Sequence, residues 1–137
     1  MEGLVSTGSE FWSGRSVLVT GHTGFKGSWL AIWLETLGAE VHGFALDPPS
    51  SPSLFRCADV QNLLKSDCRS DIRNPSDLEE VVRTVRPQVI LHLAAQPLVA
   101  TGFDDPWETW SVNVLGTVNL LDVVRRLEQP VAVVVVT

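Results

Sequence analysis

A run of apolar residues leads directly into three spaced glycines and then into a helical pattern. The run is Ser16 to Thr20, the glycines are Gly21, Gly24 and Gly27, and the helical pattern covers Ser28 to Leu37. In such a strand–turn–helix unit the first glycine allows a tight turn, the second lets a pyrophosphate approach the backbone, and the third lets the helix pack closely. The helix N-terminus also presents free N–H groups to an anion. The sequence therefore predicts a phosphate-binding turn here.

Strand and helix patterns alternate through the rest of the chain. Strand patterns cover residues 40–46, 65–69, 88–93 and 131–136, helical patterns cover 76–85 and 107–127, and a loop is expected at 48–56. Strands that alternate with helices pack as a parallel sheet with right-handed crossovers. A chain of 137 residues that is 45% apolar can bury one substantial core. We therefore expect an α/β fold with a doubly wound parallel sheet of the Rossmann type, as one dinucleotide-binding domain over residues 1–137.

Apolar spacing predicts which face of each helix is buried. The expected core-facing residues are Trp29, Ile32, Trp33 and Leu37 in the first helix and Trp110, Val114, Val118 and Leu121 in the last. The last helix also carries a start signal, with Asp105 as N-cap, Pro106 at the first helical position and Glu108 placed to reach back as in a capping box. We expect it to begin close to Trp107.

Composition and charge exclude several classes of partner. Ten basic and sixteen acidic side chains give a net charge of −6, with no basic cluster, which argues against nucleic acid or an anionic membrane surface. No apolar run approaches the roughly 20 residues of a spanning helix. Residues 1–10 lack the order of a signal peptide. We therefore expect a cytoplasmic protein.

Ligands of a doubly wound sheet bind at the carboxyl ends of its strands. Asp47 follows the second strand near the position of an acid that binds a ribose, which would favour NAD over NADP. The alternative is that its Asp-Pro-Pro segment only opens a turn. Lys26 lies in the first helical turn, where the dipole disfavours a cation unless an anion is bound beside it. A solvated lysine is the alternative.

Other polar residues give weaker signals. His22, His42 and His92 show no metal-ligand spacing, so we expect no metal site. Cys57 and Cys68 form no paired motif and are expected to be free thiols without a function. Asn113 lies in mid-helix, where asparagine is unfavourable, and a buried hydrogen bond would explain it.

Several motifs together resemble the extended short-chain dehydrogenase/reductases, and within them the CDP-glucose 4,6-dehydratases. The motifs are T-G-H-T-G-F-K-G-S-W (residues 20–29), A-L-D-P-P (45–49), S-D-I-R (70–73), H-L-A-A-Q-P-L-V (92–99) and N-V-L-G-T-V-N-L-L (113–121). The resemblance implies a lyase of nucleotide-sugar metabolism. Such an enzyme uses NAD to oxidise C4 of the glucosyl group, removes water across C5 and C6, and returns the hydride to C6.

The same resemblance implies a set of cofactor-binding residues. They are Gly21, His22, Gly24, Phe25, Lys26, Gly27, Asp47, Asp71, Ile72, Ala94, Ala95, Gln96 and Asn113. Within this set Asp47 would bind the adenosine ribose, Asp71 and Ile72 would bracket the adenine, and Ala94 to Gln96 would line the nicotinamide side. Asn113 matches an asparagine that supports the active site.

The chain departs from the family in one respect, since it contains no tyrosine. The family's Y-x-x-x-K and S-D-K motifs would lie beyond Thr137, so no catalytic residue is expected here, and we expect an N-terminal portion ending after about five strands. The longer parent would pair as a homodimer or higher homo-oligomer, using a helix near residues 107–127. Two alternatives are a related epimerase or dTDP-sugar dehydratase, and a non-catalytic dinucleotide-binding module.

Overall fold

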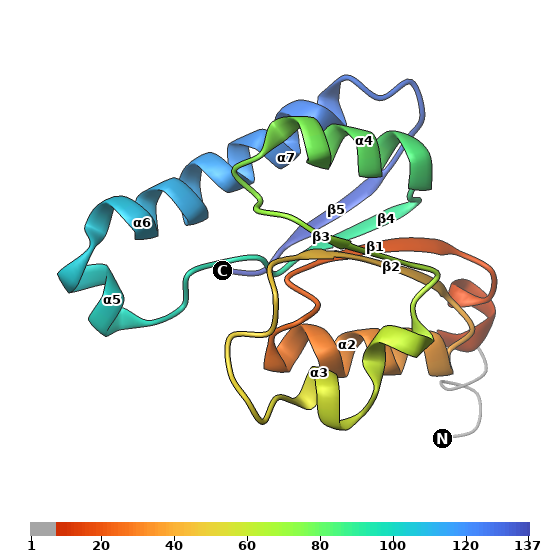
Figure 1. Ribbon diagram of the computed structural model, residues 1–137. Coiled ribbons are helices and arrows are strands. Elements are labelled where there is room, and N and C mark those ends of the chain that lie inside the picture. The colour runs from red at the N-terminus through yellow and green to blue at the C-terminus, as the bar shows by residue number, and fades with distance from the viewer. Residues whose placement is uncertain (1–7) are drawn as a thin grey trace.

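The computed structural model describes residues 8–137, which form a five-stranded parallel sheet between two layers of helices (Figure 1). The strands are β1 (Ser16–Thr20), β2 (Glu40–Ala45), β3 (Ser66–Arg69), β4 (Val89–His92) and β5 (Ala132–Val135). Their order across the sheet is β3-β2-β1-β4-β5. The predicted doubly wound parallel sheet is confirmed. The predicted domain boundary at residue 1 lies outside the described residues.

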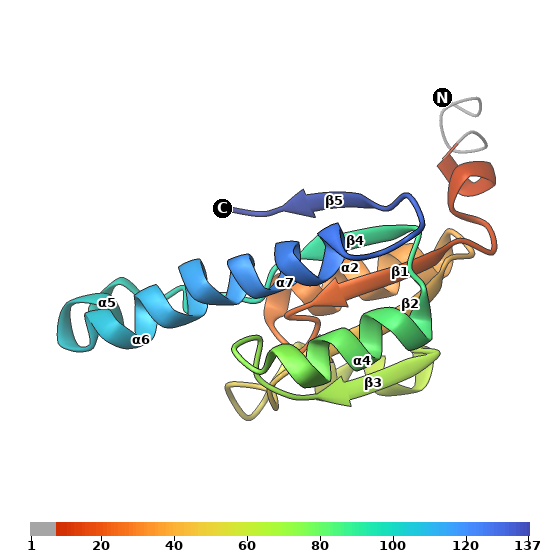
Figure 2. The same ribbon diagram turned by 90° about the horizontal axis from the view of Figure 1, so that it is seen from above.

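Helices cover both faces of the sheet. They are α2 (Phe25–Thr36), α3 (Leu54–Cys57), α4 (Pro75–Val85), α5 (Val99–Asp104), α6 (Pro106–Trp110) and α7 (Gly116–Arg125), with a 3-10 turn at Val60–Leu63 and a π-helical turn at Ser111–Leu115. α2 and α3 lie on one face, α4 and α7 lie on the other, and α5 and α6 extend beyond the ends of the strands (Figure 2). Over residues 8–137 no helix is both long and apolar enough to cross a membrane.

Two buried clusters, one on each face, hold the sheet between the helices. Val17 and Val19 of β1 pack toward α2, while Leu18 between them packs toward α4 and α7 with Leu78 and Leu120. Alternate residues of a strand point to opposite faces, so a strand that is buried on both faces is apolar throughout. The position of β1 in the middle of the sheet follows from this pattern.

The strand order places the glycine turn at the switch point of the sheet. The chain runs outward from β1 to β2 and β3 and then crosses back to β4 on the other side of β1. Thr20 at the end of β1 therefore pairs with Phe44 of β2 and with His92 of β4. This is the crevice in which doubly wound sheets bind ligands.

The expected buried face of α2 is wrong for its two tryptophans, although Ile32 is partly buried and packs against the core. Trp29 and Trp33 are 54% and 63% exposed. The residues that face the sheet and the turn are Gly27, Ser28, Ala31 and Leu34. The helix approaches the glycine turn so closely that mainly small side chains fit between them, and the aromatic side chains lie outside.

The expected buried stripe of the last helix is also wrong. Trp110, Val114, Val118 and Leu121 are 42–66% exposed, and the buried residues are Ser111, Gly116, Leu120 and Val123. The π-helical turn at Ser111–Leu115 explains part of the error, because i→i+5 bonding shifts the phase of the residues that follow it. Trp110 precedes this turn and already lies on the exposed face. Gly116 then packs on Ile72, since a Cβ at Gly116 would lie 2.5 Å from the Ile72 side chain.

The start of α6 is partly as expected. The Asp105 side chain accepts a hydrogen bond from the Glu108 backbone N–H at 3.0 Å, and Pro106 occupies the first turn. The Glu108 carboxylate does not reach back, because it pairs with Arg73 at 2.6 Å. Two further short helices, α3 and α5, were not expected. α3 begins inside the predicted 48–56 loop and is capped by the Ser53 side chain.

Candidate functional site

The glycine turn joins the ends of three strands. Gly21 has φ +77°, which disfavours other residues, and its N–H donates to the Phe44 carbonyl at 2.9 Å. A Cβ at Gly21 would lie 2.7 Å from the backbone N of Ala94, and one at Gly27 would overlap the Gly21 carbonyl oxygen. Gly24 differs, because its Cβ would have only that oxygen near it, at 3.4 Å. Gly21 and Gly27 are thus required by packing, while a Cβ at Gly24 would make only an ordinary van der Waals contact.

The N-terminus of α2 suits an anion. The helix begins at Phe25 rather than at Ser28, and its N-cap Gly24 offers no side-chain hydrogen bond. Within residues 8–137, the backbone N–H groups of Phe25, Lys26 and Gly27 have no acceptor and the first turn has no acidic residue. Lys26 is exposed and without a partner in the same part of the chain. Unsatisfied amides beside a positive side chain are features that suit a phosphate or another anion.

Buried side chains hold the turn in place. Thr23 Oγ1 donates to the Leu46 carbonyl at 2.9 Å, and Ser28 Oγ donates to the His22 carbonyl at 3.0 Å. Both hydroxyl residues are at most 5% exposed. The conformation of the turn is therefore supported by side chains of the protein itself.

The His22 side chain anchors the turn from below. It is fully buried, its Nε2–H donates to Asp67 Oδ1 at 2.8 Å, and its ring lies against Phe55 and under Gly43. Burial lowers the pKa of His22 and is only partly opposed by Asp67. Only the backbone of His22 lies at the turn, so a contact between its imidazole and a pyrophosphate does not fit this geometry.

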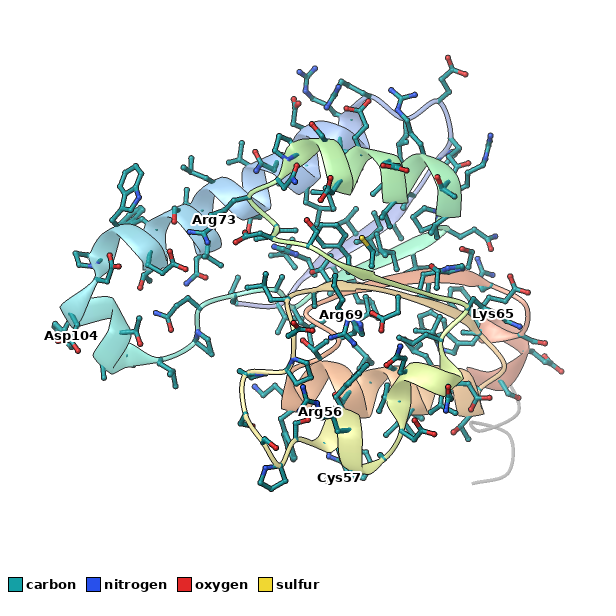
Figure 3. All side chains as sticks on the ribbon, viewed as in Figure 1. Arg56, Cys57, Lys65, Arg69, Arg73 and Asp104 are labelled. Carbon is teal, nitrogen blue, oxygen red and sulfur yellow. The ribbon has the colours of Figure 1, made fainter. Side chains whose placement is uncertain are left out.

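A chain of ion pairs leads from His22 to Asp47. Arg69 donates through Nε and Nη2 to both oxygens of Asp67, each at 2.8 Å, and through Nη1 to Asp47 Oδ1 at 3.0 Å. Its guanidinium also lies over the Phe55 ring at 4.7 Å, in the space between the sheet and the α2–α3 layer (Figure 3). Burial would raise the pKa of Asp67, but Arg69 and His22 together lower it. Asp47 itself is 84% exposed at the end of β2.

Asp71 and Ile72 follow β3 but face different surroundings. Asp71 accepts from both Arg73 Nε and Nη2, which lowers its pKa, and Arg73 continues to Glu108 and Ser111. The Ile72 side chain is 5% exposed and belongs to the core. The structure therefore leaves the Asp71 carboxylate and the backbone of both residues at this edge, while the Ile72 side chain packs inward.

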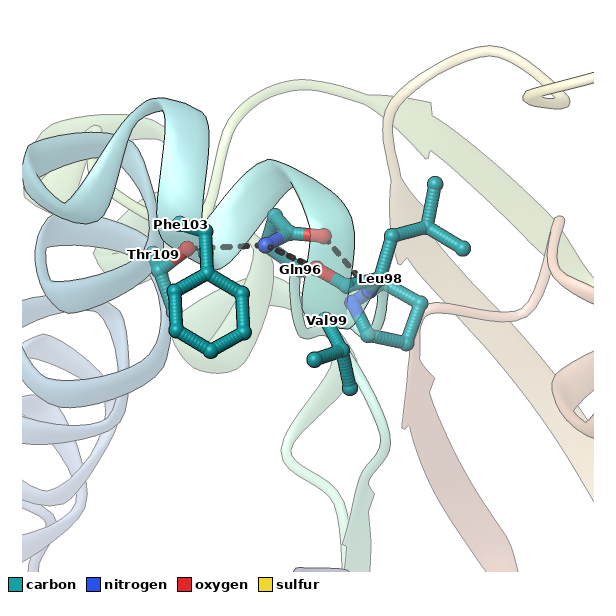
Figure 4. A pocket seen from close by; sticks show the side chains of 7 residues that line it. Gln96, Leu98, Val99, Phe103 and Thr109 are labelled. Atoms are coloured by element: carbon teal, nitrogen blue, oxygen red, sulfur yellow. Dashed lines mark hydrogen bonds between the residues drawn. The ribbon is translucent and has the colours of Figure 1, made fainter.

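The loop after β4 is fixed by its own glutamine (Figure 4). The Gln96 amide donates to Thr109 Oγ1 at 2.8 Å and to the Leu98 carbonyl at 3.1 Å, and accepts from the Leu98 N–H at 2.6 Å. Asn113 clamps the Gln96 backbone, accepting from its N–H at 2.8 Å and donating to its carbonyl at 3.1 Å. Ala94 and Ala95 lie in the same loop at the strand ends, and their methyl side chains form no hydrogen bonds.

A second buried histidine, which sequence reasoning noted only as a non-ligand, joins β1, β4 and α7. Thr117 Oγ1 donates to the Asn113 carbonyl at 2.7 Å, so it accepts from His92 Nε2–H at 3.0 Å. His92 Nδ1 then accepts from Thr20 Oγ1–H at 2.6 Å. Each donor in this series of hydrogen bonds has an acceptor when His92 is neutral. Burial lowers the pKa of His92, which favours this neutral form. These hydrogen bonds position the helical segment that carries Asn113.

Asp67, Arg69 and Gly43 were also missed. Gly43 gave a usable signal, since a glycine inside a strand often marks a close approach. The sequence signal for Asp67 and Arg69 was weaker, because two charged residues in a short strand are usual at a sheet edge. Among the described residues no group of three acidic, histidine or cysteine side chains could hold a metal ion. Cys57 and Cys68 are free thiols, as expected.

Three histidines, of which His22 and His92 are buried and His42 is partly buried, predict the pH dependence of stability. Burial lowers the pKa values of His22, His42 and His92 below their ordinary value of 6.5. Below this value the unfolded chain binds protons that the folded protein does not. The contribution of these histidines to the free energy of unfolding is therefore fully present above pH 6.5 and falls as the pH is lowered from there. Urea unfolding at several pH values measures this, and His92→Gln should flatten the fall. A stability that rises from pH 7 to pH 5.5 would contradict the assignment.

Known proteins share both the sequence and the fold of this chain. Residues 18–136 match the family model described as GDP-mannose 4,6 dehydratase. CDP-glucose 4,6-dehydratase of Salmonella typhimurium is 47% identical over 127 residues, which cover 93% of this chain and 35% of that protein. The chain thus spans about a third of the length of such relatives.

Two solved structures are also similar. Epimerase Mth375 of Methanothermobacter thermautotrophicus has a TM-score of 0.74 with 27% identity, covering 91% of this chain and 36% of that one. UDP-glucose 4-epimerase of Thermus thermophilus, in complex with NAD, has a TM-score of 0.67 with 34% identity, covering 80% of this chain and 33% of that one. The fold and the family of the chain are consistent in all these comparisons.

Proposed function

The chain belongs to the GDP-mannose 4,6-dehydratase family, and from this we propose that it is the NAD-binding part of a nucleotide-sugar 4,6-dehydratase that acts on CDP-glucose. The observation that carries the proposal is the set of free backbone amides at the start of α2, placed at the switch point of the sheet. The substrate is taken from the Salmonella relative, with which the chain shares 47% identity.

Each end of the dinucleotide has residues that fit it. The amides of Phe25 to Gly27 would hold the pyrophosphate with Lys26 beside them, and Asp47 would accept hydrogen bonds from the ribose. The segment Asp71–Ile72 would lie along the adenine, with Asp71 and the backbone as its contacts. The loop from Ala94 to Gln96, positioned by Asn113, would face the nicotinamide. NAD supplies the hydride acceptor for oxidation at C4 of the sugar.

We propose that residues 1–137 form one dinucleotide-binding domain and that acid–base groups for the sugar lie in other parts of a longer enzyme. The sequence contains no tyrosine. It covers 35% of the Salmonella relative, which leaves most of such an enzyme to contribute to the sugar site. This chain's own residues would bind and orient the cofactor.

Two alternatives keep a supporting observation each. A related epimerase is favoured by the names of both similar solved structures. A non-catalytic dinucleotide-binding module is favoured by the missing tyrosine. The fold and the glycine turn are common to all three functions, so substrate turnover separates them.

Self-association through the outer face of the last helix is part of the proposal. Trp110, Val114, Val118 and Leu121 form an apolar stripe that is 42–66% exposed. Contiguous apolar surface of this kind usually marks a protein interface. We propose that the enzyme forms a homodimer or higher homo-oligomer with this stripe buried, and we expect a cytoplasmic location from the sequence.

Titration with NAD tests the cofactor, and turnover of sugar nucleotides tests the reaction. We expect NAD to bind this chain, which isothermal titration calorimetry measures directly. A longer protein that contains this chain should convert CDP-glucose to its 4-keto-6-deoxy product. Turnover of UDP-glucose to its 4-epimer instead would support the epimerase, and a folded chain that binds no NAD would contradict the proposal.

A further inference from the structure

Arg69 is held in a fixed orientation beside the proposed ribose site. Both oxygens of Asp67 bind its Nε and Nη2 at 2.8 Å, and its guanidinium lies over the Phe55 ring. Asp67 is in turn held by the buried His22. An arginine side chain normally loses conformational entropy when it binds a ligand, because rotation about several of its bonds becomes restricted. Here two partners already fix the plane of the guanidinium.

The free side of this arginine is covered by one carboxylate. Nη1 of Arg69 donates to Asp47 Oδ1 at 3.0 Å, and the Asp47 side chain is 84% exposed while that of Arg69 is 27% exposed. Asp47 is also the residue whose position favours an unphosphorylated ribose. The same carboxylate would therefore face the ribose, and it occupies the Nη1 that the ion pair with Asp67 leaves free.

Carboxylate and phosphate are alternative partners for an arginine. A guanidinium binds either through parallel N–H···O bonds, and it binds a phosphate dianion more strongly than a neutral hydroxyl. Where an arginine stands near the ribose of a dinucleotide, it accommodates a 2′-phosphate. Asp47 excludes that phosphate by repulsion and by occupying Nη1.

We infer that Arg69 is a masked 2′-phosphate site, and that Asp47 alone keeps this site selective for a dinucleotide without the 2′-phosphate. This inference rests on the proposed function, because it places the adenosine ribose beside Asp47. It adds a residue from β3 to a selectivity that the sequence assigns to the end of β2. Removing the Asp47 carboxylate leaves a pre-oriented guanidinium with a free Nη1, and no new residue is needed to bind the phosphate.

Binding of adenosine fragments to the wild type and three variants tests the inference. The ligands are 2′,5′-ADP, which carries the 2′-phosphate, and 5′-ADP, which does not, each titrated by calorimetry together with NAD. In Asp47→Ser we expect the affinity for 2′,5′-ADP to rise about tenfold or more, as for a charge-assisted hydrogen bond to a phosphate. The gain should weaken with salt and should disappear in Asp47→Ser/Arg69→Gln. Asp122→Ser, which removes another aspartate paired with an arginine, should bind like the wild type.

The outcomes separate this inference from the proposed function. If the wild type binds NAD but Asp47→Ser gains nothing for 2′,5′-ADP, the masked site is wrong and the proposed function stands. If the gain in affinity persists in Asp47→Ser/Arg69→Gln, another cation binds the phosphate, and the role inferred for Arg69 is wrong. If the folded wild type binds neither NAD nor 5′-ADP, the proposed function fails and this inference fails with it. Circular dichroism confirms that each variant is folded.

Discussion

Gly27→Ala is expected to unfold the chain or to leave it only marginally stable. A Cβ at this position overlaps the Gly21 carbonyl oxygen and lies 2.7 Å from Cα of His22. These are backbone atoms, which no side-chain rotation can move away. Overpacking usually costs about 1–3 kcal/mol, and a clash with the backbone of both Gly21 and His22 should exceed this range. Against a typical total of about 5–15 kcal/mol, most of the stability is lost. Thermal unfolding by circular dichroism measures the change.

Gly24→Ala is the matched control, because the same methyl group, three residues earlier, would make only an ordinary van der Waals contact. Gly24 has φ −74°, which alanine adopts freely, and the nearest atom to its Cβ would be 3.4 Å away. We expect this variant to fold with almost unchanged stability. We also expect its NAD affinity to fall by about tenfold or more, since the methyl group stands where the pyrophosphate must approach the backbone. Equal loss of stability in the two variants would contradict the packing argument, and full NAD affinity in Gly24→Ala would place the pyrophosphate elsewhere.

Local patterns were enough to predict the fold and the edge at which the site lies. The alternation of apolar strands and helices requires a parallel sheet, and the turn at Gly21 has to follow its first strand. The buried faces of the helices were not predictable in the same way. The face of α2 depends on how closely it approaches the turn, and the face of α7 depends on the π-helical turn before Gly116.

The supports of the site depend on pairs that are distant in sequence. His22 bonds Asp67 across 45 residues, and His92 bonds Thr20 across 72. No periodicity indicates which residues meet at such separations, so the roles of these side chains had to come from the structure. The exception is a glycine within a strand, which indicates that something lies close to its backbone.

Gly43→Ala is expected to destabilise the protein by acting on His22. The new Cβ would lie 2.5 Å from the Nε2 and Cε1 atoms of the imidazole. The ring has no free space, because it is fully buried, lies against Phe55 and is bonded to Asp67. We expect a loss of about 1–3 kcal/mol in the free energy of unfolding, the usual cost of overpacking. Gly102→Ala in helix α5 is the matched control, since the nearest atom to its Cβ would be Thr109 Oγ1 at 3.5 Å, and it should be neutral or slightly stabilising.

A double variant identifies the imidazole as the cause. His22→Ser on its own removes the ring and the hydrogen bond to Asp67, and it should also destabilise the protein. In His22→Ser/Gly43→Ala the new methyl group occupies space that the ring has left, so the second substitution should cost little. Urea unfolding of the four proteins should give an interaction energy of about 1 kcal/mol or more, as for residues in direct contact. Additive losses would mean that the ring does not lie under β2. Because His22 is part of the glycine turn, the same four proteins titrated with NAD should lose affinity wherever the ring is displaced or removed.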